Sequence, residues 1–361
     1  MGHRWRCVLY LIETPRDQIG HDVLLRPVEG AGSLVQPSGL IRGDSDVQRH
    51  TGVGHESIIA NSYTAISITG EQSTTPVDEK GGSMPRLTVG SERGVPIQLH
   101  YNDHGSGRPV VLVHGWPLSG RMWEQQVLVL AEAGYRVVTY DRRGFGGSSQ
   151  PWEGHDYDTF ASDLGCLIDE LDLDDATLVG FSMGGGEVAR YLGTYGKHRV
   201  RQAVLLAAAT PFLLHTDDNP EGGMTAAMIA DREADLRTDR PGFLDGLTTM
   251  FFSAPDQGLL VSEVTRLYYR DIAAFASPRA TVRCLHAFAT TDFRGDLATF
   301  DLPTLVVHGD SDSNVPLDVT SRRTQEMVKG SELVVVPGAP HGLAVTHSKE
   351  VNEILLGFLA R

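Results

Sequence analysis

The chain has 361 residues, 41% of them hydrophobic and 21% charged, an ordinary balance for a globular protein. A formal net charge of -15 at pH 7 argues against nucleic acid or an anionic membrane as a partner, because both require a basic face. The cysteines Cys7, Cys166 and Cys284 have neither metal-ligand spacing nor the even count of a disulfide framework, which indicates thiols in a reducing compartment. We therefore expect a cytoplasmic protein.

Residues 1–83 differ in character from the rest of the chain. They are rich in Gly, Ser, Asp and His with little sustained periodicity, and residues 70–83 resemble a linker. The apolar run from Cys7 to Ile12 is too short for a secretory signal, and no stretch approaches the roughly 20 apolar residues of a membrane span. We predict an N-terminal extension that is disordered or an artefact of the gene start, with a targeting or partner-binding arm as the alternative.

From Met84 to the end, short β-branched runs alternate with helix-like segments. Apolar residues recur at helical spacing from Phe160 to Leu171, as expected for a helix with one face on a sheet. This alternation predicts an α/β domain over residues 84–361, with a mostly parallel central sheet flanked by helices. The runs expected to form buried strands are residues 110–113, 137–140, 177–179, 203–206, 305–307 and 333–336.

Residues 211 to about 300 interrupt this alternation. Their segments are helix-like, contain Met and Phe, and show no clear strand. We predict an inserted helical cap over the carboxyl edge of the sheet, where open α/β folds bind their ligands.

A candidate nucleophile lies in the segment Gly180-Phe181-Ser182-Met183-Gly184, between a predicted strand and a helix-like run. Small residues around the serine allow a sharp turn that projects the hydroxyl from the end of the strand. The five-residue pattern alone is weak evidence in a chain with 40 glycines, but the flanking strand and helix strengthen it.

Two partners for the serine follow late strands. A serine hydroxyl needs a base, usually a histidine oriented by a buried carboxylate. Asp312 follows the run 305–307, and His341 follows the run 333–336 through a Gly/Pro loop. The chain order Ser, Asp, His is the order of the α/β-hydrolase fold, and Ser182, Asp312 and His341 are the predicted catalytic residues.

Other assignments are open for the base and the acid. His308, at a strand end, and His347, expected inside the last helix, are alternative bases among the 14 histidines. Asp310 competes with Asp312, although the spacing after the strand favours Asp312. The segment also resembles the start of a calcium loop, but Val315 occupies the position that requires glycine.

An acyl-transfer site needs donors for the charge that develops on the acyl oxygen. The backbone N–H of Met183, directly after the serine, is one candidate. The backbone N–H of Trp116, in the loop His114-Gly115-Trp116-Pro117 after an early strand, is the other. We expect Trp116, Met183 and Phe212 to line the substrate pocket, with simple core packing as the alternative for Trp116 and Met183.

Neither of the two glycine-rich segments predicts a cofactor. Residues 144–149 lack the third glycine of a dinucleotide fingerprint, and Gly184-Gly185-Gly186 suits close packing of a helix on a strand better than anion binding. We expect neither a cofactor nor a metal site.

From about Met84 onward, the chain resembles the cofactor-free, non-haem haloperoxidases of the α/β-hydrolase superfamily. The run Gly-Phe-Ser-Met-Gly-Gly-Gly-Glu-Val-Ala-Arg-Tyr at 180–191 is the most specific match, because generic esterases share little beyond the serine and its glycines. Epoxide hydrolases and haloalkane dehalogenases are similar around 114–117 but place an aspartate where Ser182 stands. The other matching stretches are 114–119, 140–146, 211–214, 291–294 and 338–343.

The resemblance implies an esterase that is also a perhydrolase. Its partners would be a small ester or short carboxylic acid and hydrogen peroxide, and the peracid product would oxidise halide away from the site. A dedicated carboxylesterase, lactonase or amidase is the main alternative, and a non-catalytic binding protein is disfavoured because all three predicted catalytic residues are present. The oligomeric state stays open, a homo-oligomer included, and the resemblance does not extend to residues 1–83.

Overall fold

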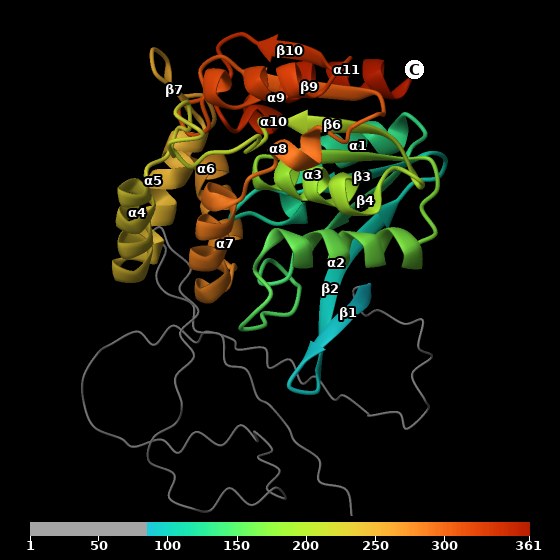
Figure 1. Cartoon of the computed structure of the whole chain (residues 1–361), viewed down its shortest axis with the longest axis horizontal. Helices are drawn as coiled ribbons and strands as arrows, with labels where there is room; N and C mark the ends of the chain where they lie inside the picture. Colours follow the sequence, from blue (N-terminus) through green and yellow to red (C-terminus); the bar gives the residue numbers. More distant parts are fainter. Residues whose placement is uncertain (1–84) are drawn as a thin grey trace, which may run out of the picture. The chain divides into compact units, whose positions relative to one another are not determined.

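The structure, a computed structural model, describes residues 85–361, and the extension predicted over residues 1–83 lies outside the described residues. The described chain is built on an eight-stranded sheet with the strand order β1-β2-β4-β3-β5-β6-β9-β10 (Figure 1). The strands are β1 (Arg86–Glu92), β2 (Val95–His104), β3 (Pro109–Val113), β4 (Arg136–Tyr140), β5 (Ala176–Phe181), β6 (Val200–Leu206), β9 (Thr304–Gly309) and β10 (Glu332–Val336).

Six neighbouring strands of this sheet, from β4 to β10 in spatial order, are parallel, and β1 and β2 are antiparallel at one edge. Every residue of β3, β5 and β9 is buried, as expected for parallel strands covered on both faces. The six runs predicted from the sequence are these parallel strands, but the expected burial was wrong for residues 333–336, because β10 is an edge strand in which only Val336 is buried. The long antiparallel strand β2 was not predicted, because its charged and half-exposed residues give no continuous apolar run.

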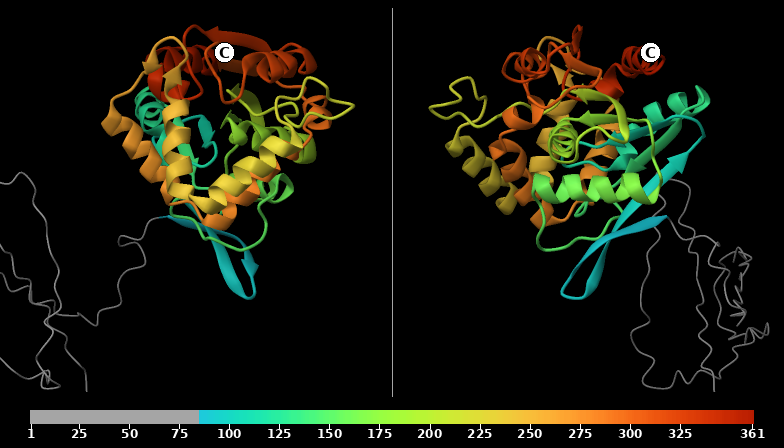
Figure 2. Two further views of the ribbon diagram at one scale, coloured as in Figure 1. Left: turned by 90° about the vertical axis from the view of Figure 1, so that its left-hand side faces the viewer. Right: turned by 45° about the vertical axis from the view of Figure 1, so that its right-hand side comes forward.

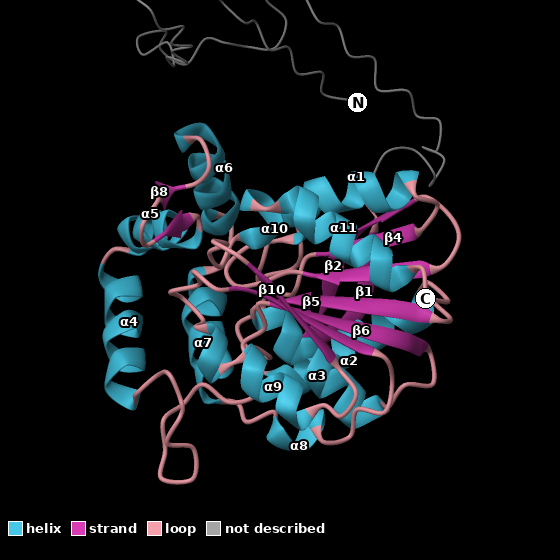
Figure 3. Cartoon of the chain, turned by 90° about the horizontal axis from the view of Figure 1, so that it is seen from above, coloured by secondary structure: helices cyan, strands magenta, loops and turns pink. Residues whose placement is uncertain are grey.

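Helices cover both faces of the sheet (Figure 3). One face carries α1 (Glu124–Glu132), α10 (Leu343–Thr346) and α11 (Ser348–Leu359), and the other carries α2 (Tyr157–Glu170), α3 (Met183–Tyr195), α8 (Arg294–Leu297) and α9 (Ser321–Met327). The apolar side chains of α2 at helical spacing, including Phe160, Leu164 and Ile168, are fully buried against the sheet. The α/β-hydrolase fold expected from the sequence is thus confirmed.

The segment between β6 and α8 forms the cap (Figure 2, yellow to orange). Its helices are α4 (Ala226–Thr238), α5 (Arg240–Phe251), α6 (Glu263–Ala274) and α7 (Pro278–Thr290). The expectation of no strand in this region was wrong in one detail, because β7 (Ser253–Ala254) and β8 (Gly258–Leu259) pair as a short hairpin. Two-residue strands lack the length to produce a recognisable alternation.

The cap leaves and rejoins the rest of the fold at one place. The backbone N–H of Phe293, just after α7, donates to the carbonyl of Pro211, just before the cap, at 2.9 Å. The ring of Phe293 is fully buried and packs edge-on against Tyr157 of α2. The start and end of the cap are therefore fixed to each other and to the helix layer beneath the sheet.

None of the helices formed by residues 85–361 combines the length and apolarity needed to cross a bilayer.

Candidate active site

Ser182 occupies a sharp turn between β5 and α3. Its φ of +52° lies in the left-handed region that non-glycine residues avoid, and it persists because the surrounding hydrogen bonds fix it. The Ser182 N–H donates to Leu206 of β6, and its carbonyl accepts from Gly185 and Ala209. The strained turn lifts the side chain out of the sheet, so that the hydroxyl lies beyond the end of β5.

Glycines on both sides of the turn allow this close approach. A Cβ on Gly180 would collide with the backbone of Gly184, and a Cβ on Gly184 would collide with the carbonyl of Val113 on β3. A Cβ on Gly185 would meet Ala208. The glycine run at the start of α3 thus packs the helix against the strands, as its sequence context suggested.

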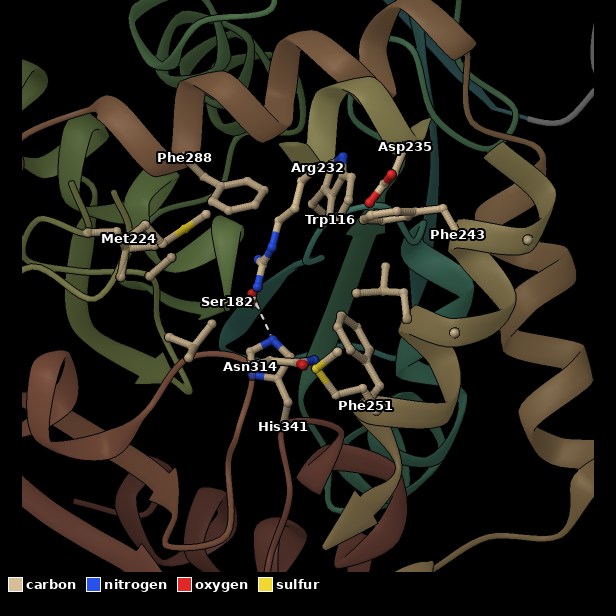
Figure 4. A pocket seen from close by; sticks show the side chains of 17 residues that line it. Trp116, Ser182, Met224, Arg232, Asp235, Phe243, Phe251, Phe288, Asn314 and His341 are labelled. Carbon is tan, nitrogen blue, oxygen red and sulfur yellow. Dashed lines mark hydrogen bonds between the residues drawn. The ribbon is translucent and has the colours of Figure 1, made fainter. Parts of the chain in front are cut away.

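The three predicted catalytic side chains form one hydrogen-bonded chain. His341 Nε2 lies 2.9 Å from Ser182 Oγ, and His341 Nδ1 lies 2.6 Å from Asp312 Oδ2 (Figure 4 shows the contact with Ser182). All three residues are buried, and the imidazole is held between the rings of Phe181 and Phe251 at 5.0 and 4.7 Å. This geometry is suited to passing a proton from the serine to a histidine of fixed tautomer.

Asp312 is kept ionised by its neighbours. Burial alone would raise the pKa of its carboxyl, but the charge of His341 and hydrogen bonds from His308 and His341 outweigh burial and lower the pKa well below its usual range. Its second oxygen, Oδ1, accepts from the backbone N–H groups of Asn314 and Val315 at 2.9 and 2.8 Å. Hydrogen bonds therefore fix both oxygens of the Asp312 carboxylate.

The structure brings one of the alternative histidines to the site, but not as a base. His308 Nε2 lies 2.8 Å from the carbonyl of Val315 and 3.1 Å from Asp312 Oδ2. Because both neighbours accept hydrogen bonds, this nitrogen carries the proton, and Ser321 Oγ, 2.7 Å from Nδ1, donates to the other nitrogen. His308 thus lies beside Asp312 and, like His341, contacts its oxygen Oδ2.

The remaining alternatives lie elsewhere. Asp310 Oδ1 accepts from the backbone N–H of Gly338 and makes no contact with His341 among the described hydrogen bonds. His347 was expected inside the last helix, but it lies between α10 and α11 and contacts Thr346. The helical segment is interrupted at His347, where α10 ends after a single turn and before α11 begins.

Two backbone N–H groups are left available beside the serine. Met183 is the first residue of α3, where the N–H has no intrahelical acceptor. None of the backbone hydrogen bonds outside regular elements uses the Trp116 N–H within residues 85–361. The Trp116 indole donates to the carbonyl of Thr281 on α7 at 3.0 Å, which joins this loop to the cap.

A buried ion pair supports the loop that carries Trp116. Arg142 donates to Glu187 Oε2 at 2.6 Å and to the carbonyl of His114 at 2.9 Å, and the hydroxyl of Tyr140 donates to the other oxygen of Glu187. Burial and the charge of Arg142 lower the pKa of His114 to about 3, so the ring is neutral. Its Nε2 accepts from the Arg142 N–H, which leaves Nδ1–H to donate to Gly115.

A cavity of about 340 Å³ opens onto Ser182 and His341 between the sheet and the cap (Figure 4). Its walls are mainly apolar, which suits the acyl chain of a small substrate. The lining residues include Trp116, Leu213, Met224, Arg232, Asp235, Phe243, Leu247, Met250, Phe251, Phe288, Asn314 and Val315.

Two of the three residues expected in the pocket do not line the cavity. Trp116 does, but Phe212 turns the other way and packs over the guanidinium of Arg294 at 5.2 Å, and the next residue, Leu213, takes the lining position. The Met183 side chain is buried in the core beneath α3. The side-chain amide of Asn219 donates to the Phe212 carbonyl at 3.1 Å, a contact between loop residues that the sequence does not reveal.

The sequence analysis also missed three polar residues of the cavity, namely Arg232, Asp235 and Asn314. Arg232 lies on α4 with Ile229 and Leu236, which are buried, and this i, i+3, i+7 spacing could have placed it on the inward face. Asn314 lies two residues after Asp312, and its buried Nδ2 has no hydrogen-bond partner among the described residues. A loop position of this kind leaves no periodic signal.

No group of three or more His, Cys, Asp or Glu side chains within residues 85–361 is arranged to hold a metal ion.

Comparison with known proteins identifies the family of the chain. Residues 108–348 match the family model described as alpha/beta hydrolase fold. The non-heme chloroperoxidase CPO-A1 of Kitasatospora aureofaciens is 44% identical over 265 residues, which are 73% of this chain and 96% of the relative. A bifunctional esterase/perhydrolase of Acinetobacter calcoaceticus is 35% identical over 266 residues, 73% of this chain and 96% of the relative.

Among solved structures, the bromoperoxidase from Bacillus anthracis matches with a TM-score of 0.75 and 53% identity, covering 77% of this chain and 100% of that one. The chain is therefore an enzyme of the α/β hydrolase family, and within that family it belongs with the non-heme haloperoxidases.

Proposed function

We propose that the protein is a serine esterase and perhydrolase that works through an acyl-serine intermediate. The observation that carries the proposal is the hydrogen-bonded chain from Ser182 through His341 to Asp312, which opens into a largely apolar cavity. The relatives named as non-heme chloroperoxidase and as esterase/perhydrolase support the same class of reaction.

In the first step, His341 Nε2 takes the proton from the Ser182 hydroxyl while Oγ attacks the carbonyl carbon of an ester or short carboxylic acid. The backbone N–H groups of Met183 and Trp116 donate to the developing oxyanion. When the tetrahedral intermediate collapses, the proton on His341 passes to the leaving alcohol or water, and the acyl group stays on Ser182. Asp312 stabilises the transient imidazolium.

In the second step, water or hydrogen peroxide attacks the acyl-serine, with His341 again taking the proton. Water yields the carboxylic acid, whereas hydrogen peroxide yields the peracid, and Ser182 regains its hydrogen in both cases. The peracid then transfers one oxygen to bromide or chloride in solution, giving the hypohalous acid and the carboxylate. Haloperoxidase activity is thus an indirect result of acyl transfer, and the halide needs no site on the protein.

The test compares wild type, Ser182→Ala and the control Ser348→Ala, which changes a serine at the start of α11 outside the cavity. Bromination of monochlorodimedone with hydrogen peroxide and bromide is measured with and without acetate, and hydrolysis of 4-nitrophenyl acetate is measured in parallel. We expect acetate-dependent bromination and ester hydrolysis in wild type and Ser348→Ala, and neither activity in Ser182→Ala.

Bromination that survives in Ser182→Ala would refute the acyl-serine route. Ester hydrolysis without acetate-dependent bromination in the wild type would instead leave a dedicated carboxylesterase, lactonase or amidase, the alternative that the sequence left open.

A further inference from the structure

The cavity contains a cation that the proposed mechanism does not use. Arg232 projects from α4, and its side chain extends into the cavity toward Ser182 (Figure 4). The neighbouring lining residues Trp116, Phe243 and Phe288 are aromatic, so the guanidinium lies against apolar walls. An arginine aimed at a nucleophile from an apolar cap is a candidate for binding substrate.

Arg232 is unpartnered within the described part of the chain. No carboxylate lies within 4.0 Å of it, and it takes part in none of the hydrogen bonds or cation–π contacts found there. The three buried arginines are paired: Arg142 with Glu187, Arg143 with Asp163, and Arg266 with Asp245 and Glu263. Arg232 is half-buried and, unlike these three, has no carboxylate partner among the described residues.

Partial desolvation makes an unpaired cation receptive to an anion. Burial lowers the pKa of Arg232, and no neighbouring carboxylate opposes the effect. A guanidinium that has lost part of its hydration gains a charge-assisted, bidentate pair of hydrogen bonds when a carboxylate reaches it.

Asp235, one helical turn further along α4, is the other charged residue of the cavity wall. It is exposed, and its carboxylate lies more than 4.0 Å from the Arg232 nitrogens, since the two form no ion pair among the described residues. Asp235 therefore does not occupy the guanidinium of Arg232. Its negative charge in the cavity wall repels an incoming carboxylate.

We propose that Arg232 binds a carboxylate on the acyl part of the substrate, so that the preferred substrates are monoesters of short dicarboxylic acids. The inference rests on the proposed acyl transfer. The acyl group stays in the cavity through both steps, whereas the leaving group departs after the first. Only a contact with the acyl part can therefore orient the substrate for attack by Ser182 and the acyl-enzyme for attack by water or peroxide.

The experiment compares two esters of equal length, mono-4-nitrophenyl glutarate and 4-nitrophenyl pentanoate, in wild type, Arg232→Gln and Arg237→Gln. Arg237 is the matched control, because it is an exposed arginine on the same helix and does not line the cavity. We expect the ratio of kcat/KM for the anionic ester to kcat/KM for the neutral ester to fall by about tenfold or more in Arg232→Gln. A loss of this size corresponds to the free energy of one charge-assisted hydrogen bond. Arg237→Gln should retain the wild-type ratio.

Two further variants sharpen the result. Arg232→Lys keeps the charge but loses the planar fork, so it should retain part of the preference. Asp235→Asn removes the repulsive charge and should increase the preference. An unchanged ratio in Arg232→Gln, or an equal fall in Arg237→Gln, would overturn the proposal.

Binding measured without turnover separates this inference from the proposed function. Calorimetric titration of the wild type with glutarate and with uncharged glutaramide should show tighter binding of glutarate, and Arg232→Gln should lose the difference. Equal binding of the two ligands by the wild type would overturn the inference even if Arg232→Gln did not fold. A wild type that binds glutarate but cleaves neither ester would refute the proposed function, whereas the proposed binding of a carboxylate by Arg232 would still hold.

Discussion

At the scale of single residues, Asp312 has two histidine neighbours with different tasks. His341 connects it to Ser182, and His308 donates to the same carboxylate oxygen, Oδ2. The sequence could identify His341 because a Gly/Pro loop after a strand is a usual position for a catalytic base. It could not reveal that His308 acts on the carboxylate, since that contact depends on how the chain turns between residues 309 and 315.

His308 is a positioning residue, and its replacement tests that role. Because His308→Phe removes one donor to a buried carboxylate, we expect kcat/KM for ester hydrolysis to fall by about tenfold, chiefly through kcat. His347→Gln, outside the site, is the control. Thermal unfolding of both variants establishes that the folded enzyme is measured, and an unchanged kcat in folded His308→Phe would contradict the role.

The low pKa of Asp312 predicts a pH dependence of stability. A carboxyl whose pKa is lower in the folded state than its ordinary value of about 3.9 stabilises the fold above that value and loses this contribution as the pH falls. We expect the wild type to lose free energy of unfolding more steeply than Asp312→Asn between about pH 5 and the acid limit of folding. Urea unfolding at a series of pH values measures both curves, and parallel curves would contradict the prediction.

At the scale of elements, α3 connects the nucleophile to the loop that carries Trp116. Glu187 of α3 pairs with Arg142 after β4, and Arg142 donates to His114 after β3, so three strand ends meet at one buried ion pair. The sequence showed each strand, because runs such as 110–113 are apolar throughout. It did not show this pairing, since the two charges are 45 residues apart.

Breaking that pair should destabilise the fold. Glu187→Gln leaves the buried Arg142 without its counter-charge, and we expect a loss of about 3–5 kcal/mol in the free energy of unfolding. The control Glu332→Gln breaks an exposed pair with Arg361 and should cost less than about 1 kcal/mol. Urea unfolding compares the two, and equal losses would argue against a special role for the buried pair.

At the scale of the whole molecule, the sequence predicted the sheet far better than the cap. A parallel strand buried on both faces is apolar at every position, so composition alone identifies it. The inner face of the cap depends on how α4 to α7 lie over the sheet, which is set by contacts such as that between Trp116 and Thr281. Phe212 was therefore placed wrongly, and Arg232 was missed.

We propose that residues 84–361 form the hydrolase domain. The described residues, 85–361, group as one compact unit, and the relatives that match this region are themselves covered almost completely. A chain shortened to begin at Met84 should fold, with an unfolding midpoint and ester kcat/KM equal to those of the full chain. Loss of soluble protein or of activity in the shortened chain would contradict the domain boundary.

The hydrogen bond between Phe293 and Pro211 has a consequence for how such enzymes diversify. The segment that it closes carries Arg232 and most of the cavity wall, whereas Ser182 precedes the segment and Asp312 and His341 follow it. A segment whose two ends meet can be exchanged or reshaped as a module without moving the strands that hold the reacting groups. Most of the cavity wall and the three reacting side chains are thus encoded in separate stretches of the gene, which meet where Phe251 of the cap packs on His341.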